Sequence, residues 1–411
     1  MSDIIAARDE AEVADAVRTA LSAGKTLEIR GHGSKRAVGR PSQTDLTLDL
    51  SALTGVTLYE PEELVLSARA ATPRADIEDM LAASGQMLAF EPMDPAPLLG
   101  SAAGAGTTSG TTSGTLGGLF AVNLSGPRRI SHGAVRDHAL GIKAVSGRGE
   151  PFKSGGRVVK NVTGYDLPRL MAGAFGTLCV ATEITLKVLP RPPMEETLVA
   201  KVASPEAAAA ALSAAMGSSC EVSGAAFLPE GVAGRLPGLS GSPAVVALRL
   251  EGVAPSVSAR RTMLRAVLAP FGAADVLETD ASRALWLGVR DVAPFCGLGE
   301  RAVWRISTEP MAGPALAARL AADLGGEAYC DWAGGLIWLC LPGESAHGDE
   351  VRAALAPHGG HATLIRATAA ERARTPVFQP LDAALAALTK RVKESFDPGL
   401  VLNPGRMHAG M

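Results

Sequence analysis

Apolar residues recur at helical spacing near the start of the chain and at strand spacing after it. Val13, Val17 and Leu21 share one face of a helix predicted over Glu10–Ala23, and Gly24 ends it. Short runs of β-branched or alternating apolar residues follow and predict strands. These runs are Leu27–Ile29, Leu46–Leu50, Val56–Glu60, Leu64–Ala70 and, further on, Leu178–Leu189. A second helix is predicted over Pro73–Ser84, with Thr72 as its cap.

The pattern changes after Pro190-Arg191-Pro192-Pro193, where three prolines in four residues exclude both helix and central strand. Beyond this point Ala-rich helical spacing alternates with strands in two similar rounds. The first round is Leu198–Val202, helix Pro205–Met216, Gly224–Leu228, Ala244–Glu251 and helix Val257–Phe271. The second is Val303–Thr308, helix Pro314–Leu324, Glu327–Asp331, Leu336–Leu341, helix Glu350–Ala356 and His361–Arg366. Two βαββα rounds predict a duplicated ferredoxin-like α+β unit, and a basic amphipathic helix over Leu381–Phe396 follows it.

Composition narrows the class of protein. A chain of 411 residues is expected to hold two or three domains, and its net charge of −3 argues against a polyanion-binding surface, so no nucleic acid is expected. The polar, acidic start predicts no signal peptide, and no apolar run is long enough to span a bilayer. Five scattered cysteines without C-x-x-C spacing favour a reducing compartment and predict neither a disulfide framework nor a metal site.

Glycine-rich turns next to strands are the first candidate chemistry. Arg30–Lys35 (RGHGSK) follows a strand, Thr115–Gly118 (TLGG) precedes an apolar run, and Gly173–Thr177 (GAFGT) leads into another strand. Glycines let backbone N–H groups approach an anion closely, so such turns suit a diphosphate. Each turn alone is equally well explained as an ordinary loop.

Several longer motifs together resemble one family. They are Leu124–Arg129 (LSGPRR), Gly133–Asp137 (GAVRD), Lys160–Leu170 (KNVTGYDLPRL), Gly173–Thr177, Leu186–Pro192 (LKVLPRP) and Phe396–Arg406 (FDPGLVLNPGR). This combination resembles the vanillyl-alcohol-oxidase, or PCMH-type, FAD-binding fold, and is most similar to the E-subunit family of bacterial glycolate oxidases. The resemblance implies a two-subdomain FAD-binding domain over residues 1–192 with an inserted ferredoxin-like α+β cap over 193–370. Residues 371–411 would form a helix and tail that return to the FAD domain.

The resemblance also assigns cofactor residues, with FAD bound non-covalently because His32 stands one residue earlier than the position at which some members of the fold attach flavin. The residues so assigned are Arg30, Gly31, His32, Gly33, Ser34, Lys35, Thr115, Leu116, Gly117, Gly118, Ser125, Gly126, Val135, Asp137, Asn161, Gly164, Tyr165, Asp166, Gly176, Thr177, Val180 and Asn403.

The sequence departs from the family pattern at two places in this domain. Cys179 replaces a usual glycine, and its Cβ fits only if its φ is negative; the small-residue segment Gly100–Ser113 is an insert without an assigned role.

Oxidation of a 2-hydroxy acid needs a cation for the carboxylate and a base for the hydroxyl proton. Arg305 is the candidate anchor and His361 the candidate base, while an interdomain ion pair and a structural histidine are the respective alternatives. The metal-assisted motif GHxGDGNxH of related catalytic subunits is missing. His347-Gly348-Asp349 imitates three letters of it, but Asp349 is interpreted as a helix cap.

The expected function is that of the FAD-binding subunit of a glycolate oxidase complex, which converts glycolate to glyoxylate. Its expected partners are a catalytic flavin subunit and an iron–sulfur subunit. Its expected location is the cytoplasm, with membrane contact only through those partners. The alternatives are a self-sufficient FAD-dependent 2-hydroxy-acid dehydrogenase and a degenerate fold kept as a scaffold.

Overall fold

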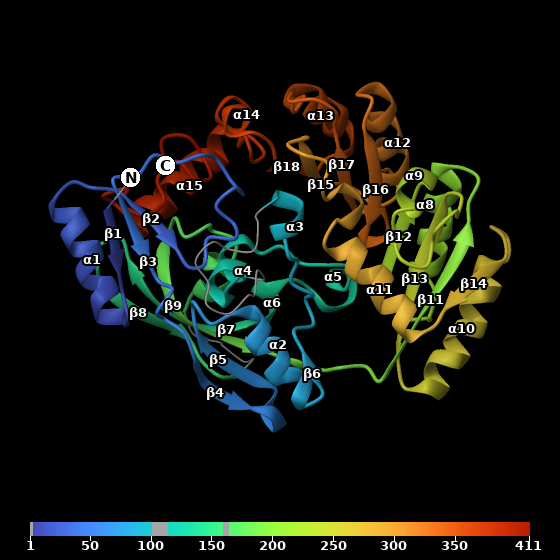
Figure 1. The fold of residues 1–411 in the computed structure, drawn as a ribbon, viewed down its shortest axis with the longest axis horizontal. Helices are drawn as coiled ribbons and strands as arrows, with labels where there is room; N and C mark the ends of the chain where they lie inside the picture. The colour runs from blue at the N-terminus through green and yellow to red at the C-terminus, as the bar shows by residue number, and fades with distance from the viewer. Residues whose placement is uncertain (1–2, 101–113, 159–163) are drawn as a thin grey trace.

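The protein is described by a computed structural model that covers residues 3–100, 114–158 and 164–411 (Figure 1). The N-terminal half contains β1 (Asp3–Ala6), α1 (Glu10–Ser22), β2 (Leu27–Arg30), β3 (Leu46–Asp49), β4 (Val56–Glu60), β5 (Val65–Arg69), α2 (Arg74–Ala83), β6 (Gln86–Met87), α3 (Ala96–Leu99), α4 (Leu116–Val122), α5 (Arg129–His132), α6 (Val135–His138), β7 (Ala139–Ser146), β8 (Pro151–Gly155), α7 (Leu167–Met171), β9 (Cys179–Lys187) and β10 (Leu189–Pro190). These elements form two main sheets, the parallel sheet β1-β3-β2 and the antiparallel sheet β4-β5-β9-β7-β8.

The parallel sheet shares its core with the end of the chain. Leu27 of β2 pairs with Leu46 of β3 and forms an isolated parallel bridge to Leu402. Leu27 N–H donates to Val401 O at 2.7 Å, and Asn403 N–H donates to Leu27 O at 2.9 Å. The C-terminal tail therefore lies beside β2, directly before the first glycine-rich turn.

The second half builds one sheet of eight strands. Its elements are β11 (Met194–Lys201), α8 (Pro205–Met216), β12 (Gly224–Leu228), α9 (Glu230–Ala233), β13 (Val245–Gly252), α10 (Ala254–Leu268), β14 (Ala274–Leu277), α11 (Thr279–Arg290), β15 (Val303–Ser307), α12 (Gly313–Asp323), β16 (Glu327–Asp331), the 3-10 turn η3 (Trp332–Gly334), β17 (Leu336–Cys340), α13 (Gly348–Leu355) and β18 (His361–Arg366). The strand order β14-β11-β13-β12-β16-β17-β15-β18 repeats one four-strand order and its reverse, joined where β12 meets β16. This is the topology of two ferredoxin-like units placed edge to edge.

The two faces of this sheet are covered differently. One face packs its buried residues, among them Leu198, Leu248 and Ile337, in a core shared with α8, α10, α12 and α13. The other face, with Tyr329 and Trp338, packs against α11 and against Met93 and Leu98 of the N-terminal half. Arg305 pairs with Trp338 of β17, and directly paired residues lie on the same face of a sheet. Arg305 therefore belongs to the second face, which is turned toward the N-terminal half.

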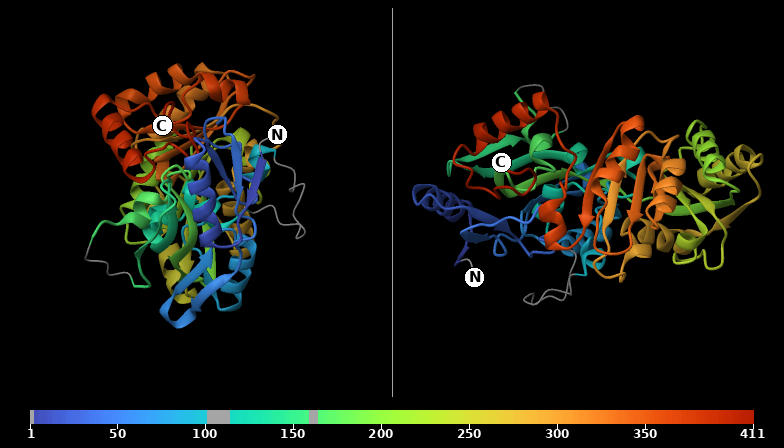
Figure 2. Two further views of the ribbon diagram at one scale, coloured as in Figure 1. Left: turned by 90° about the vertical axis from the view of Figure 1, so that its left-hand side faces the viewer. Right: turned by 90° about the horizontal axis from the view of Figure 1, so that it is seen from above.

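The last elements, α14 (Ala369–Arg374) and α15 (Ala383–Phe396), return to the N-terminal half, where α15 lies above its strands (Figure 2). We propose domain boundaries near residues 192 and 370, because β10 still pairs with β6 of the first half whereas β11 opens the eight-stranded sheet. No helix in the described ranges is long and apolar enough to cross a bilayer.

The structure corrects two predicted caps. Pro73, not Thr72, precedes α2, and the Thr72 hydroxyl donates to Arg69 O instead. Asp349 lies inside the first turn of α13, whose N-cap is His347 with φ 49°. The sequence interpretation also missed β14 and α11, which fill the interval between the two rounds of the repeat.

Candidate functional site

The first two glycine-rich turns lie against each other. Thr115 caps α4 through its Oγ1, which accepts a hydrogen bond from Gly118 N–H at 3.2 Å. A Cβ added at Gly118 would lie 3.3 Å from Thr115 Oγ1 and 3.7 Å from Lys35 Nζ. A Cβ at Gly31 would lie 3.1 Å from the same Thr115 oxygen. The missing side chains therefore keep open a space bordered by both turns and by the Lys35 ammonium.

The third glycine-rich turn joins this space through the C-terminal tail. Asn403 Oδ1 accepts from Ile29 N–H at 2.9 Å, and its Nδ2 donates to Phe175 O at 2.9 Å. Gly176 has φ 67°, and a Cβ there would lie 2.8 Å from Asn403 Nδ2. A glycine is thus required both by the backbone conformation and by the approach of the asparagine.

Two adjoining cavities of about 110 and 100 Å³ mark the groove between these turns. The residues that line both cavities are Ile29, Gly31, Thr115, Gly118, Ala121, Phe175 and Asn403. Gly117, Gly176 and Cys179 line the first cavity only, and the side chains of Arg30, His32, Ser34, Lys35 and Arg406 line the second only. Cys179 does not have a positive φ, so its Cβ fits at the position where the family usually has a glycine.

Gly33 also lines the second cavity, whereas the other predicted cofactor residues lie away from both. Leu116, Val135 and Val180 are buried in the hydrophobic cores, and Val180 points to the opposite side of β9 from its neighbours Cys179 and Ala181. Asp137 accepts from Ala134 N–H at 2.9 Å and so caps α6. Thr177 lies beside the groove, with its carbonyl bound to Lys393 Nζ at 2.6 Å.

Five further predicted residues also lie outside the groove, and a sixth cannot be placed. Ser125 is buried, with no hydrogen-bond partner for its hydroxyl among the described residues, and Gly126 packs against Glu91. Gly164 and Tyr165 are exposed, the latter by 88%. Asp166 caps α7. Asn161, like the insert at 101–113, lies outside the described residues.

The groove carries titratable groups whose pKa values are displaced. Burial lowers the pKa of the Lys35 ammonium to about 8, although nearby Asp94 opposes the shift. Burial also lowers the pKa of His32, whose Nδ1 has no hydrogen-bond partner among the described residues. A largely buried cation that forms no ion pair favours an anion in the groove. Lys35 fits that description, since its Nζ contacts Ser34 Oγ at 3.3 Å and makes no ion pair in the described part of the chain.

The two predicted catalytic residues lie together in the cap. Arg305 on β15 pairs with Thr363 of β18, and His361 opens the same strand β18 opposite Ser307. Arg305 is 8% exposed, and burial lowers its pKa to about 10. The pKa of His361 is lowered, first by partial burial and then by the positive charges of three arginines, Arg305, Arg129 and Arg136. The base candidate is therefore neutral at pH 7, and it lies at the exposed start of β18 within the field of these three arginines.

Lys393 and Arg406 contact this site but were not predicted from the sequence. Lys393 is the one buried residue of α15, and it joins Thr177 O and Leu402 O across the tail. Arg406 donates to Lys35 O and Arg36 O, both at 2.9 Å. The only signal for Lys393 was its i, i+4 spacing to Asp397. No group of three or more metal-ligating side chains occurs within the described residues.

Known proteins resemble the chain in sequence and in fold. A family profile described as an FAD binding domain matches residues 2–113. Glycolate oxidase subunit GlcE of Escherichia coli (strain K12) is 36% identical over 394 residues, which cover 96% of this chain and 95% of that protein. Glycolate oxidase subunit GlcD of Bacillus subtilis (strain 168) is 28% identical over 211 residues, or 51% of this chain and 42% of that protein.

The fold comparison agrees with the predicted class. The structure of p-cresol methylhydroxylase with substrate bound superimposes with a TM-score of 0.69 at 14% identity, covering 99% of this chain and 88% of that one. Alkyldihydroxyacetonephosphate synthase gives a TM-score of 0.66 at 16% identity, over 98% and 75%. The PCMH-type fold is thereby confirmed. The end-to-end identity to GlcE and the FAD-domain match together show that this chain uses FAD and belongs to the family of glycolate oxidase subunit GlcE, a family of FAD-dependent oxidoreductases.

Proposed function

We propose that this chain is the FAD-binding subunit of a glycolate oxidase complex, which oxidises glycolate to glyoxylate and passes electrons to an iron–sulfur subunit. The observation that carries the proposal is the 36% identity to GlcE over nearly the whole of both chains. The name of the second relative, glycolate oxidase subunit GlcD, supports a catalytic flavin subunit as the other partner. We place the complex in the cytoplasm, with any membrane contact made through the partners.

The glycine-lined groove fits the cofactor. FAD, when bound, supplies a two-electron acceptor in its flavin ring and brings two phosphate groups that need hydrogen-bond donors. Backbone N–H groups of Gly31–Lys35 would hold the diphosphate, with Lys35 as its counter-charge, while Gly118 would leave room for it beside Lys35. Asn403 and Gly176 would lie along the flavin, where Asn403 is fixed by its two hydrogen bonds.

Arg305 and His361 would serve the substrate side. A buried guanidinium orients a carboxylate through two parallel N–H donors. The neutral imidazole of His361 would accept the hydroxyl proton as hydride leaves the adjacent carbon. This arrangement favours the second candidate function, a self-sufficient 2-hydroxy-acid dehydrogenase, whereas the missing metal-assisted histidine motif favours dependence on the partner subunit.

Co-purification and cofactor release test the proposal. A tagged chain expressed with its neighbouring subunits should retain them and should reduce a dye with glycolate. Acid precipitation of the chain should leave the yellow chromophore in the supernatant, because we propose non-covalent FAD. A chain that purifies alone from such cells, or one whose flavin stays in the pellet, would contradict the respective part of the proposal.

A further inference from the structure

The indole of Trp332 lies within stacking distance of two guanidinium groups that come from different halves of the protein. Arg129 Cζ lies 4.5 Å from the centroid of the Trp332 ring, and Arg305 Cζ lies 4.8 Å from it. Arg129 opens α5 in the N-terminal half, whereas Arg305 belongs to β15 of the cap sheet. Both guanidinium groups are therefore held close to one aromatic ring, at the junction of the two halves.

The backbone is strained at Trp332, the residue whose ring contacts both guanidinium groups. Trp332 and Ala333 have φ values of 52° and 56°, which non-glycine residues seldom adopt. Asp331 Oδ1 accepts from Trp332 N–H at 2.7 Å, and Trp332 Nε1 donates to Gly126 O at 3.0 Å. Strain of this kind persists where the surrounding structure imposes it, commonly at functional sites.

The two guanidinium groups form no ion pair with a carboxylate of the described residues, although Asp137 lies near Arg129. Neither Arg129 nor Arg305 forms an ion pair in the described part of the chain, and Arg305 Nη2 is buried without a hydrogen-bond partner. Asp331 is the acid near Arg305, but burial raises the pKa of its carboxyl group to about 7. The buried Arg305 and the half-buried Arg129 contact one ring and repel each other, and an unpaired buried guanidinium is costly. An anion between them would remove both penalties.

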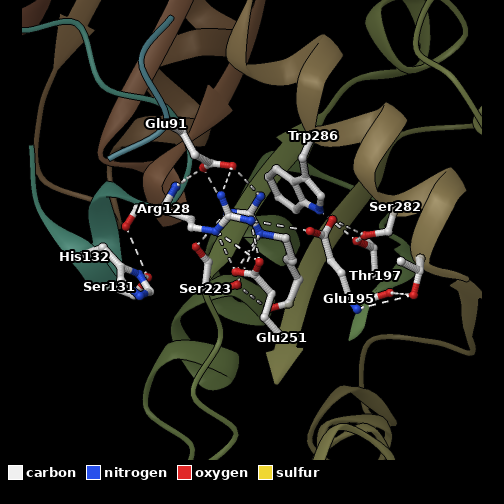
Figure 3. Close-up of polar contacts among 12 residues, drawn as sticks. Glu91, Arg128, Ser131, His132, Glu195, Thr197, Ser223, Glu251, Ser282 and Trp286 are labelled. Carbon is white, nitrogen blue, oxygen red and sulfur yellow. Dashed lines mark hydrogen bonds and ion pairs between the residues drawn. The ribbon is translucent and has the colours of Figure 1, made fainter. Parts of the chain in front are cut away.

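A buried network of arginines and glutamates surrounds Arg128, the residue before Arg129 (Figure 3). Arg128, the neighbouring residue, binds Glu91 at 2.7 Å and reaches across to Glu251 of the cap at 2.5 Å. Arg249 of the cap binds Glu91 in return, at 2.9 Å. Each half thus contributes an acid and a base that pair with the other half, so the start of α5 is fixed relative to the cap sheet. Arg128 forms its ion pairs within this network, whereas Arg129 forms none with the described residues.

We infer that Arg129 and Arg305, spaced by Trp332, form a two-arginine receptor for the carboxylate of a small organic acid, with Arg129 as the second anchor beside the predicted Arg305. The inference rests on the proposed function for the identity of that acid as a 2-hydroxy acid. Trp332 is a positioning residue in this receptor, and the receptor exists only while the cap is held against the N-terminal half. His361 lies on β18 two residues before Thr363, the partner of Arg305, and so shares the face of the sheet with Arg305, where it would face the carbon that bears the hydroxyl group.

Binding of oxalate to the FAD-loaded full chain tests the receptor by isothermal titration calorimetry, without any turnover. We expect Arg129→Gln and Arg305→Gln each to weaken oxalate binding by at least about tenfold, the loss of one charge-assisted contact. Arg169→Gln, which removes an exposed arginine whose only ion pair among the described residues is with Asp166, is the matched control and should change nothing. Trp332→Phe keeps a ring and should retain most of the affinity, whereas Trp332→Leu should lose it with little change in FAD content.

The outcomes separate the receptor from the proposed function. Oxalate binding that is unaffected by Arg129→Gln overturns the receptor, whatever the complex does with glycolate. Phosphate that binds more tightly than oxalate overturns the assignment to a carboxylate. Binding that requires both arginines, in a complex that does not oxidise glycolate, would support the receptor and contradict the proposed function. A thermal melt of each variant identifies any that fail to fold, and Arg129→Lys then replaces Arg129→Gln, with reduced affinity expected because lysine lacks the planar fork.

Discussion

Asn403 accepts a hydrogen bond from Ile29 N–H across 374 positions of sequence, at 2.9 Å. The same side chain donates to Phe175 O, so one amide joins the strand before the first glycine-rich turn to the turn before β9. Its own backbone is left-handed, with φ 43°, a conformation that asparagine tolerates better than most residues. The cofactor groove is therefore closed by the last residues of the chain.

Replacement of Asn403 should weaken FAD binding. Asn403→Asp keeps the acceptor for Ile29 but sets a carboxylate oxygen against Phe175 O, which costs about 1–3 kcal/mol for the unpaired groups. We expect FAD to bind at least about tenfold more weakly, as measured by quenching of flavin fluorescence. Asn403→Gly relieves the backbone while removing the side chain, so an FAD affinity as high as that of the parent in both variants would show that this amide has no part in the groove.

Gly117 and Gly118 should respond differently to alanine, because their missing Cβ atoms point in different directions. A Cβ at Gly117 would lie 2.9 Å from Ala70 O, a backbone atom, so Gly117→Ala should lower the melting temperature. A Cβ at Gly118 would enter the groove beside Lys35, so Gly118→Ala should weaken FAD binding at little cost in stability. We therefore expect Gly118, and not Gly117, to act by keeping the diphosphate space free.

Gly156→Ala is the control for both variants, since its Cβ would meet nothing within 4 Å. Melting curves of the FAD-free proteins and FAD titrations give the two readouts. Equal FAD affinity in the Gly118→Ala variant and the parent would remove the second glycine-rich turn from the cofactor site.

FAD affinity should fall at alkaline pH because of Lys35. Burial sets the pKa of this ammonium to about 8 in the cofactor-free protein, and a bound diphosphate favours the charged form. Below pH 8 the lysine is already charged and affinity should be constant. Above pH 8 binding must take up a proton, so the dissociation constant should rise by up to about tenfold per pH unit. Lys35→Arg should abolish this dependence, and a parent protein whose affinity is flat from pH 7 to 9.5 would contradict the role of Lys35.

Lys393 should anchor the C-terminal tail. Its ammonium is 3% exposed and binds Asp397 Oδ2 at 2.6 Å, while Asp397 also accepts from Val401 N–H and Leu402 N–H. Lys393→Met leaves that carboxylate buried without its cation, which costs about 3–5 kcal/mol of unfolding free energy. Lys390→Met removes an exposed lysine of the same helix, 3.8 Å from Glu394, and should cost about 1 kcal/mol or less. Urea titration measures both, and similar losses in the two variants would show that the tail is held elsewhere.

The cap was predictable from sequence because its strands are bounded by turns and its helices have regular apolar spacing. Glu327–Asp331 and His361–Arg366 were predicted at their observed bounds. The intervening helix α11 was missed although its buried Leu285, Trp286 and Val289 have helical spacing, so this helix was predictable from the sequence.

The site was predictable only as far as local motifs reach. Each glycine-rich turn is a short continuous segment of sequence, so each could be recognised by itself. Together the turns mark the groove, including the part around Lys35. The contacts between Arg128 and Glu251 or between Arg249 and Glu91 join positions 123 and 158 residues apart, and no local pattern pairs them. Trp332 could not be associated with Arg129 for the same reason, since their proximity depends on how the cap sheet docks.

Anaerobic stopped-flow mixing with glycolate, which follows the visible absorbance of the flavin, tests the central claim most directly. The chain loaded with FAD is mixed with glycolate alone and then together with its partner subunits. We expect no useful rate of bleaching in the isolated chain, because the metal-assisted histidine motif is missing and general base catalysis commonly contributes about 10²–10⁴-fold. Bleaching should appear in the reconstituted complex. Rapid bleaching of the isolated chain that is lost in Arg305→Ala or His361→Ala would contradict the relay and establish a self-sufficient dehydrogenase.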